Sequence, residues 1–339
     1  MKKIILILIT VLVTACNISS SPEQNNGITE STTIEDYFPI KENTKYSYEG
    51  KGNEFATYTE FVDYVANNRI QTRTNNGGTE SVKVMEIKDG ELLLLYHRGE
   101  TYFRYNFLEE EYNNGKILLK EPLEEGNSWD YDENTTAKIT HISKEVVTHL
   151  GNFNAIEVTL EGEQGKTVNY YAKDMGLIKT ITSGEGYEVS STLSSIEKNV
   201  PLMQTIKLYY PDTDGIHLNT IDVPIEFYTN EEPEYIVEKN IKDLSVYEII
   251  SPNTKINQIA FNEEEKSVHV DLSEDFVTEM NAGAGFEGMI LQSLTNTLGN
   301  YYGVEKVYIT IDGGPYESGH IIIEEGEPSL VNYDNVKEE

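Results

Sequence analysis

The chain has very little of what disulfide-linked and metal-centred folds require. Cys16 is the only cysteine among 339 residues, so an internal disulfide is excluded and a zinc site would lack thiolate ligands. The six histidines show neither an H-x-x-H nor an H-E-x-x-H spacing. We therefore expect neither a metal site nor a bound cofactor.

Basic residues are also scarce. The sequence has 26 Lys and Arg residues against 58 Asp and Glu residues, which gives a formal net charge of −32. A field of this sign repels polyanions, so nucleic acid and anionic lipid head groups are excluded as partners.

The N-terminus is the one segment with a targeting pattern. "MKKIILILITVLVTAC" has a basic start and an apolar run too short to span a bilayer comfortably, as in a secretory signal. Residues 13–16, Val-Thr-Ala-Cys, resemble the lipobox of bacterial lipoproteins, which implies diacylglycerol on Cys16 and palmitate among its acyl chains. Two acyl chains anchor a protein stably. We predict a lipoprotein signal peptide over residues 1–16 and an extracytoplasmic, membrane-anchored chain; the alternative is a plain signal peptide with an incidental cysteine.

Residues 17–33 are polar and predict a flexible tether that spans roughly 20–25 Å. Residues 34–198 then alternate short β-branched and aromatic runs with Asn, Asp and Gly turns, which predicts an antiparallel all-β domain. Its many tyrosines are typical of strand packing, and an aromatic platform for a ligand is the alternative.

A weak repeat divides this β domain. "PIKENTKYSY" from Pro39 and "PLEEGNSWDY" from Pro122 align without a gap, 83 positions apart, and Tyr46 matches Trp129. The alignment favours an internal duplication of two β units, each opened by a proline turn that brings an aromatic ring into a core. A chance match is the alternative.

After Pro201 the pattern changes to mixed strands and helices. We expect a helix that follows the capping residue Asn230, a second helix over residues 286–302, and strands on either side of both. Residues 202–330 therefore predict an α+β domain with helices packed on a small sheet, followed by an acidic tail over residues 331–339.

The predicted α+β domain resembles the GerMN domain family, a module of spore-germination and sporulation proteins and of many bacterial lipoproteins. The matching stretches are "IKLYYPDTDG", "KINQIAFNEEEKSVHVDLSEDF" and "LQSLTNTLGNYYGVEKVYITIDG". The resemblance implies protein assembly or cell-wall association, in sporulation or germination, rather than catalysis.

Two local motifs suggest ligands and fail on spacing. Gly283, Gly285 and Gly288 form a G-x-G-x-x-G, but ten residues separate Gly283 from Leu272, the end of the expected strand before it, unlike a dinucleotide loop. Asp212 and Asp214 suggest a calcium loop, but the twelfth position holds Val223 instead of an acid.

We therefore predict a cell-envelope lipoprotein that is not an enzyme, with no catalytic residues, which docks onto an envelope protein or peptidoglycan. The alternatives are a glycan- or solute-binding lipoprotein with its ligand site in the β domain, and a cell-wall hydrolase with paired carboxylates. The partner surface is predicted on the exposed faces of the two helices, at Glu234, Glu238, Lys242, Gln292, Asn296 and Asn300.

Overall fold

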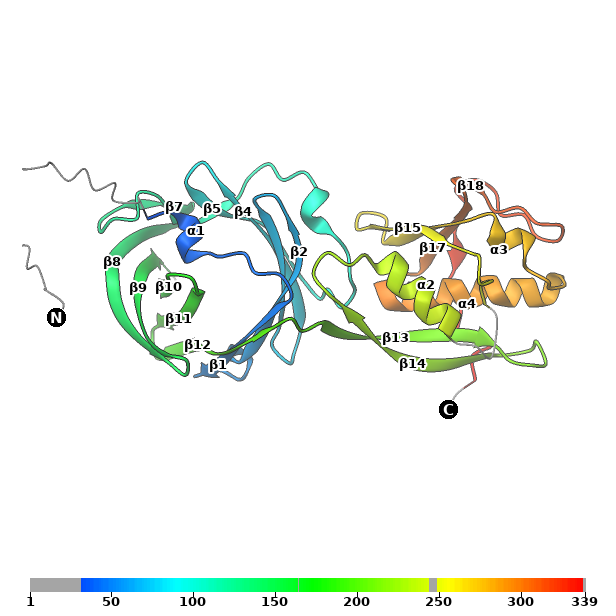
Figure 1. Ribbon diagram of the computed structural model, residues 1–339, viewed down its shortest axis with the longest axis horizontal. Coiled ribbons are helices and arrows are strands. Elements are labelled where there is room, and N and C mark those ends of the chain that lie inside the picture. Colours follow the sequence, from blue (N-terminus) through cyan, green and yellow to red (C-terminus); the bar gives the residue numbers. More distant parts are fainter. Residues whose placement is uncertain (1–31, 164, 244–248, 338–339) are drawn as a thin grey trace, which may run out of the picture. The chain divides into compact units, whose positions relative to one another are not determined.

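The computed structural model describes residues 32–163, 165–243 and 249–337 (Figure 1). The predicted signal peptide, Cys16 and almost all of the predicted tether lie outside these residues. Within the described ranges, the helices are too short or too polar to cross a bilayer.

The N-terminal region is one antiparallel sheet of twelve strands, which confirms the predicted all-β architecture (Figure 1). Its strand order is β6-β5-β4-β3-β2-β1-β12-β11-β10-β9-β8-β7, so two six-stranded meanders meet at the β1–β12 pair. The predicted repeat coincides with the starts of these meanders, because Tyr46 lies in β1 and Trp129 in β7, and both rings are buried. The strands are β1 (Thr44–Lys51), β2 (Tyr58–Ala66), β3 (Arg69–Asn75), β4 (Glu80–Lys88), β5 (Glu91–Gly99), β6 (Lys116–Lys120), β7 (Ser128–Asp132), β8 (Thr135–Thr148), β9 (Gly151–Gly162), β10 (Gly165–Ala172), β11 (Gly176–Gly184) and β12 (Tyr187–Lys198).

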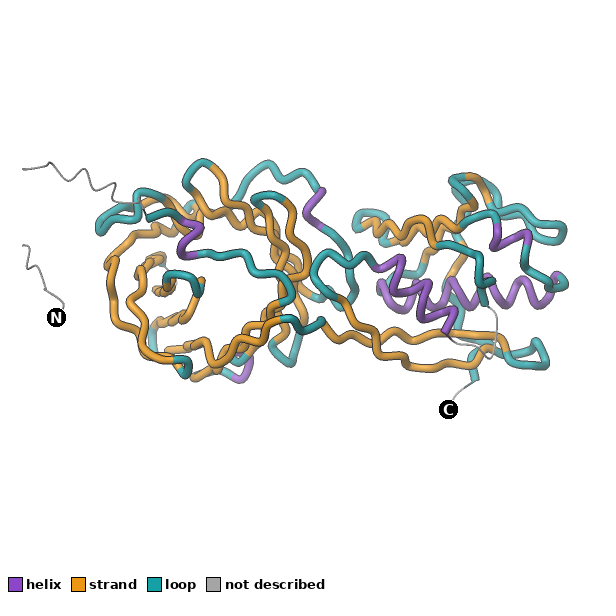
Figure 2. Tube along the Cα trace, viewed as in Figure 1, coloured by secondary structure: helices purple, strands orange, loops and turns teal. Residues whose placement is uncertain are grey.

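This rolled sheet, β1 to β12, curls until its two edge strands meet, as the trace in Figure 2 shows. Two side chains at or just before β7 connect this edge to β6. Trp129 Nε1 donates to the Ile117 carbonyl at 2.9 Å, and Asn127 Nδ2 donates to the Lys120 carbonyl at 2.9 Å. Two backbone acceptors of the β6 edge are thereby satisfied, which would otherwise be open to pairing with another chain.

A short helix, α1 (Ile34–Tyr37), packs at one end of the rolled sheet. Ile34 is fully buried in the inner core, and its N–H donates to the Glu121 carboxylate at 3.0 Å. The Asp36 carbonyl accepts from the Asp174 N–H at 2.7 Å. Thr33, assigned to the tether from sequence, precedes α1 directly, and its N–H donates to Asp36 at 3.3 Å.

The C-terminal region has the predicted α+β architecture. A two-stranded ribbon, β13 (Leu202–Pro211) and β14 (Leu218–Phe227), is followed by a small sheet on which helices pack. Strands β16 and β17 pair in parallel, so the chain needs a crossover between them, and α4 supplies it. The remaining elements are α2 (Pro233–Asp243), β15 (Ile256–Asn262), β16 (Ser267–Leu272), α3 (Asp275–Thr278), α4 (Ala284–Tyr302), β17 (Lys306–Ile311), β18 (Gly314–Pro315) and β19 (Ser329–Leu330).

Asn230 does not cap α2, contrary to the sequence prediction. Its side-chain oxygen accepts the Val65 N–H of β2 at 2.7 Å, and α2 begins three residues later at Pro233. Proline suits a first helical turn because its missing N–H would have no partner there. Asn230 therefore joins the C-terminal region to the rolled sheet instead of starting the helix.

Residues 331–337 pack against the C-terminal region. The Val331 N–H donates to the Glu305 carbonyl at 3.0 Å, Tyr333 stacks on Tyr209, and Lys337 pairs with Asp212 at 2.9 Å.

The outer face of β2 to β4 shares one core with the C-terminal region. Tyr64, Val82 and Phe103 lie in the same buried cluster as residues of β13, β14, α2 and α4, and the Phe103 and Tyr302 rings are 5.0 Å apart. Strand β2 is thus buried on both faces, with Val62 in the inner core and Tyr64 in this outer one.

A buried ionic cluster lies at the same junction. Asp63 accepts from Arg73 and Arg104, each at 3.1 Å, and these three side chains are at most 1% exposed. Arg104 also donates to the Tyr228 carbonyl, and its own N–H donates to the Tyr301 hydroxyl of α4 at 3.0 Å. These contacts explain why the chain from Thr33 onward forms one compact unit.

Candidate functional site

The rolled sheet encloses a cavity of about 490 Å³, a volume within the range of small-molecule sites. Both meanders line it: Tyr58, Lys83 and His97 come from the first, and Tyr131, Tyr171 and Leu177 from the second. A second pocket of about 540 Å³ adjoins it, because Leu118, Tyr131 and Asn169 line both.

The polarity of the cavity changes along the strands. Phe38, just after α1, lines the cavity at the end nearest that helix, and Met85 and Leu94 lie partway along the wall. Lys83 lies nearer the β3–β4 turn than Met85 does, and Glu60 lies near the corresponding end of β2. The floor of the cavity is therefore apolar, and its rim carries charge.

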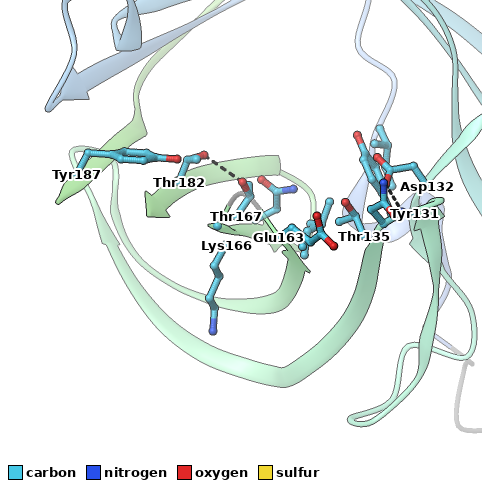
Figure 3. A pocket seen from close by; sticks show the side chains of 14 residues that line it. Tyr131, Asp132, Thr135, Glu163, Lys166, Thr167, Thr182 and Tyr187 are labelled. Carbon is cyan, nitrogen blue, oxygen red and sulfur yellow. Dashed lines mark hydrogen bonds between the residues drawn. The ribbon is translucent and has the colours of Figure 1, made fainter. Parts of the chain in front are cut away.

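The adjoining pocket is lined mainly by polar side chains from the β7–β8 and β9–β10 turns and the strands beside them (Figure 3). Thr167 and Thr182 hydrogen-bond across β10 and β11 at 3.2 Å, and Lys166 pairs with Glu161 at 3.3 Å. Hydrogen bonds from Thr135 and from the Asn134 N–H hold the pKa of Asp132 below its usual value. This pocket forms a hydrophilic mouth beside the apolar cavity.

Burial controls the titration of the aromatic lining. It raises the pKa of Tyr58 and of Tyr171, and the Glu60 carboxylate raises both further, so both phenols keep their protons at neutral pH. Burial, followed by the nearby Lys83 ammonium, lowers the pKa of His97, so its imidazole is neutral there. The cavity thus offers neutral hydrogen-bonding groups next to one lysine, Lys83, and one carboxylate, Glu60.

This arrangement suits recognition of a small molecule: an apolar interior with a few polar groups is the usual composition of ligand sites. Within the described ranges, there is no group of three or more His, Cys, Asp or Glu side chains that could hold a metal ion. Tyr58 and Tyr171 are among the many tyrosines of the predicted β domain, but which of these rings would face a cavity depends on the curl of the sheet. We find no signal in the sequence that identifies Lys83.

The predicted partner residues on α2 face inward, which corrects the expectation that they are exposed. Glu238 is 8% exposed; its carboxylate accepts the Ile256 N–H at 2.9 Å and pairs with Lys242 at 2.7 Å and Lys255 at 3.1 Å. Glu234 accepts the Ile259 N–H at 2.8 Å. These acids satisfy backbone donors at the start of β15 and within it, so they hold the helix on the sheet.

The predicted residues on α4 differ among themselves. Asn296 is fully buried: it donates to the Asn332 carbonyl at 2.6 Å and accepts the Asn332 N–H at 2.9 Å. Gln292 donates to the Leu330 carbonyl at 3.0 Å, whereas Asn300 is exposed. The prediction of an exposed face is wrong for Asn296 because residues 330–332 run along this side of the helix.

At the two motifs rejected on spacing, the acidic side chains bind other groups of the chain itself. Gly283 precedes α4 as its N-cap, and the buried Glu287 in the first turn accepts from the Tyr316 hydroxyl at 2.8 Å. The Asp212 carboxylate accepts the Ile216 N–H at 2.9 Å and the Lys337 ammonium at 2.9 Å. These hydrogen bonds lower the pKa of Asp212 strongly. Glu287 and Asp212 therefore stabilise the fold through these contacts.

Replacement of Glu238 by Gln is expected to lower the free energy of unfolding by about 1–2 kcal/mol at pH 7, since charge-assisted hydrogen bonds are lost. Burial alone would raise the pKa of Glu238, but hydrogen bonds from Lys242, Ile256 and Lys255 outweigh it and lower the pKa below 4.5. The stabilisation is therefore present above pH 4.5 and disappears as the pH falls through the lowered pKa.

Urea unfolding of both proteins from pH 7 down to pH 3 measures this effect. The difference between them should shrink toward the acid end. Glu226→Gln, at an exposed position of β14, is the control and should leave stability unchanged. A Glu238→Gln deficit that stays constant with pH would contradict the ionic role.

Comparison with known proteins identifies the C-terminal region. Residues 207–317 match the family described as Germane, sporulation and spore germination, which confirms the GerMN resemblance for this domain. The match covers about a third of the chain. No curated protein matches.

Three solved structures are similar to parts of the chain. One is a putative exported protein with a YmcC-like fold from Bacteroides fragilis, with 12% identity and a TM-score of 0.32; it covers 48% of this chain and 99% of its own. A putative lipoprotein from Parabacteroides distasonis has 14% identity, a TM-score of 0.29 and coverage of 48% and 98%. The tandem GerMN domains of the sporulation protein GerM from Bacillus subtilis have 16% identity, a TM-score of 0.28 and coverage of 40% and 47%.

Proposed function

We propose that the chain is a non-catalytic cell-envelope lipoprotein of sporulation or germination. Cys16 carries the lipid anchor outside the cytoplasm, and the GerMN-type domain docks onto an envelope protein or peptidoglycan. The observation that carries this proposal is the match of residues 207–317 to the sporulation and spore germination family.

The docking surface is the outer edge of β14. On its other side β14 pairs with β13 along its whole length, whereas among the described residues only Leu218 has a partner on the outer edge, Val336. An open strand edge can accept a strand from another protein. Ile221 of this strand is 40% exposed, so an apolar side chain is available beside the edge.

The proposal predicts a specific cross-linking pattern in cells of the source bacterium. A photoreactive amino acid at Ile221 should yield discrete adducts with an envelope protein or with peptidoglycan fragments. The same group at Val147, a 66% exposed strand position in β8, is the matched control and should yield none. Equal adducts from both positions, or none from Ile221, would remove the β14 edge as the docking surface.

A second function, ligand binding by the rolled sheet, is favoured by a specific observation. An aromatic-lined cavity lies between the two meanders and adjoins a polar mouth. We propose that this region binds a small molecule while the GerMN-type domain docks. The ionic cluster at Asp63 holds the two regions in one body, so both activities belong to one unit.

A further inference from the structure

We infer that the ligand of the rolled sheet is an amphipathic anion, a molecule with an apolar body and a single acidic head group. This inference rests on the proposed ligand-binding function and names the chemical class that the cavity would accept. The apolar body lies on the floor of the cavity, and the head group lies beside Lys83 at its rim.

The floor determines the apolar part. Phe38, Met85, Leu94 and Leu177 line it, together with the protonated phenol of Tyr171. Burial of an apolar body there gains about 25 cal/mol for each Å² removed from water. A strongly hydrated ligand such as a simple sugar would leave these side chains uncovered.

The rim determines the sign of the head group. Lys83 is half-buried, and no carboxylate of the described residues lies within ion-pair distance of its ammonium. The other lysine at the site, Lys166 in the mouth, is already paired with Glu161. Lys83 is the one lysine among the residues that line the cavity, and a ligand anion would give its ammonium an ionic partner.

A neighbouring group on the same wall supplies a further donor. His97 lies opposite Lys83 in the β4–β5 ladder and lines the cavity as well. A carboxylate has oxygen acceptors for more than one of these donors.

One group at the rim opposes an anion. Glu60 on β2 hydrogen-bonds only to Thr74 among the described residues, at 3.5 Å, and also carries no ion pair. Its repulsion places the head group on the Lys83 side and permits one negative charge there rather than several. Removal of Glu60 should therefore strengthen binding, whereas removal of Lys83 should weaken it.

The test uses two probes with the same aromatic body. Anilinonaphthalene sulfonate carries one negative charge, and phenylnaphthylamine is the same molecule without the sulfonate. The chain without residues 1–31, which is a compact unit, is titrated with each probe by fluorescence at pH 7. Laurate is then used to displace the bound sulfonate probe.

The expected result has opposite signs at two residues. Lys83→Gln should weaken the sulfonate probe about tenfold, since a charge-assisted hydrogen bond is lost, and should leave the neutral probe unchanged. Glu60→Gln should strengthen the sulfonate probe several-fold. Lys138→Gln, at an exposed position on β8, is the control and should change neither affinity.

The outcomes distinguish the inference of an anionic head group from the proposal that the rolled sheet binds a ligand at all. If both probes bind the wild type equally and Lys83→Gln changes neither, the anionic head group is wrong while ligand binding stands. If neither probe nor laurate binds, or if Leu94→Trp in the cavity wall leaves probe binding unchanged, ligand binding by the rolled sheet is wrong as well. Near-ultraviolet circular dichroism of every variant verifies that its packing is native.

Discussion

Replacement of Asp63 by Asn is expected to lower the free energy of unfolding by about 3–5 kcal/mol, the largest stability effect of any single change we consider. Asp63 is the carboxylate between two guanidinium groups, and all three side chains are at most 1% exposed. Asn keeps the size of the side chain but removes its charge, so Arg104 is left with no carboxylate and Arg73 with only Glu80. Desolvated cations without a counter-ion are costly because the interior cannot screen them.

Urea unfolding provides the measurement, followed by fluorescence and by far-ultraviolet circular dichroism. Trp129 is the only tryptophan and lies in β7 of the rolled sheet, so its fluorescence reports that region alone. If the cluster joins the two regions, both signals coincide in the wild type and separate in Asp63→Asn. Asp222→Asn is the control, since its pair with Lys207 is exposed and should contribute about 0.5 kcal/mol or less. An equal loss in both variants would contradict the role of the cluster.

Replacement of Cys16 by Ser is expected to abolish membrane association. Serine cannot accept the diacylglyceryl group through a thioether, and one cysteine is all that the chain has. Two acyl chains bury enough methylene groups for stable anchoring, and none of the described helices could replace them as a membrane span. The prediction comes from the lipobox resemblance.

Fractionation of cells that express the wild type, Cys16→Ser and Ser19→Ala measures this effect. The wild type and Ser19→Ala should sediment with membranes and incorporate labelled palmitate, whereas Cys16→Ser should do neither. Retention of Cys16→Ser on membranes, or an unlabelled wild type, would overturn the anchor.

The architecture could be predicted from local pattern because each strand carries its own signal. Alternating apolar residues and Asn-Gly or Asp-Gly turns define antiparallel strands without knowledge of their partners. The position of Tyr46 and Trp129 in the repeat even marked the first strand of each meander. The helix between β16 and β17 was likewise predicted from a helical run between two strands, whereas the parallel pairing of those strands was not predicted.

The helix faces could not be predicted because distant segments cover them. A helical pattern separates apolar from polar residues, and we expected the polar side at Glu238 and Asn296 to face solvent. In the structure, the Glu238 carboxylate accepts a backbone N–H of β15, and the Asn296 amide oxygen accepts the backbone N–H of Asn332. Both side chains therefore act as hydrogen-bond acceptors inside the fold. Those partners lie 18 and 36 residues away along the chain.

The cavity escaped prediction for a related reason. Glu60 and Lys83 lie on β2 and β4 with β3 between them, and nothing in either strand indicates that the sheet curls round to enclose them. Only the meeting of β6 with β7 turns one face of the sheet into an interior. The site is a property of the closure of the sheet and not of any one motif.

The central claim is that the chain docks onto a component of the cell envelope, and co-sedimentation tests it most directly. The chain without residues 1–31 is mixed with purified peptidoglycan and, separately, with envelope membranes of the source bacterium. The account predicts that the protein pellets with at least one of them and that an excess of unlabelled protein displaces it. Protein that remains in the supernatant with both would contradict the account.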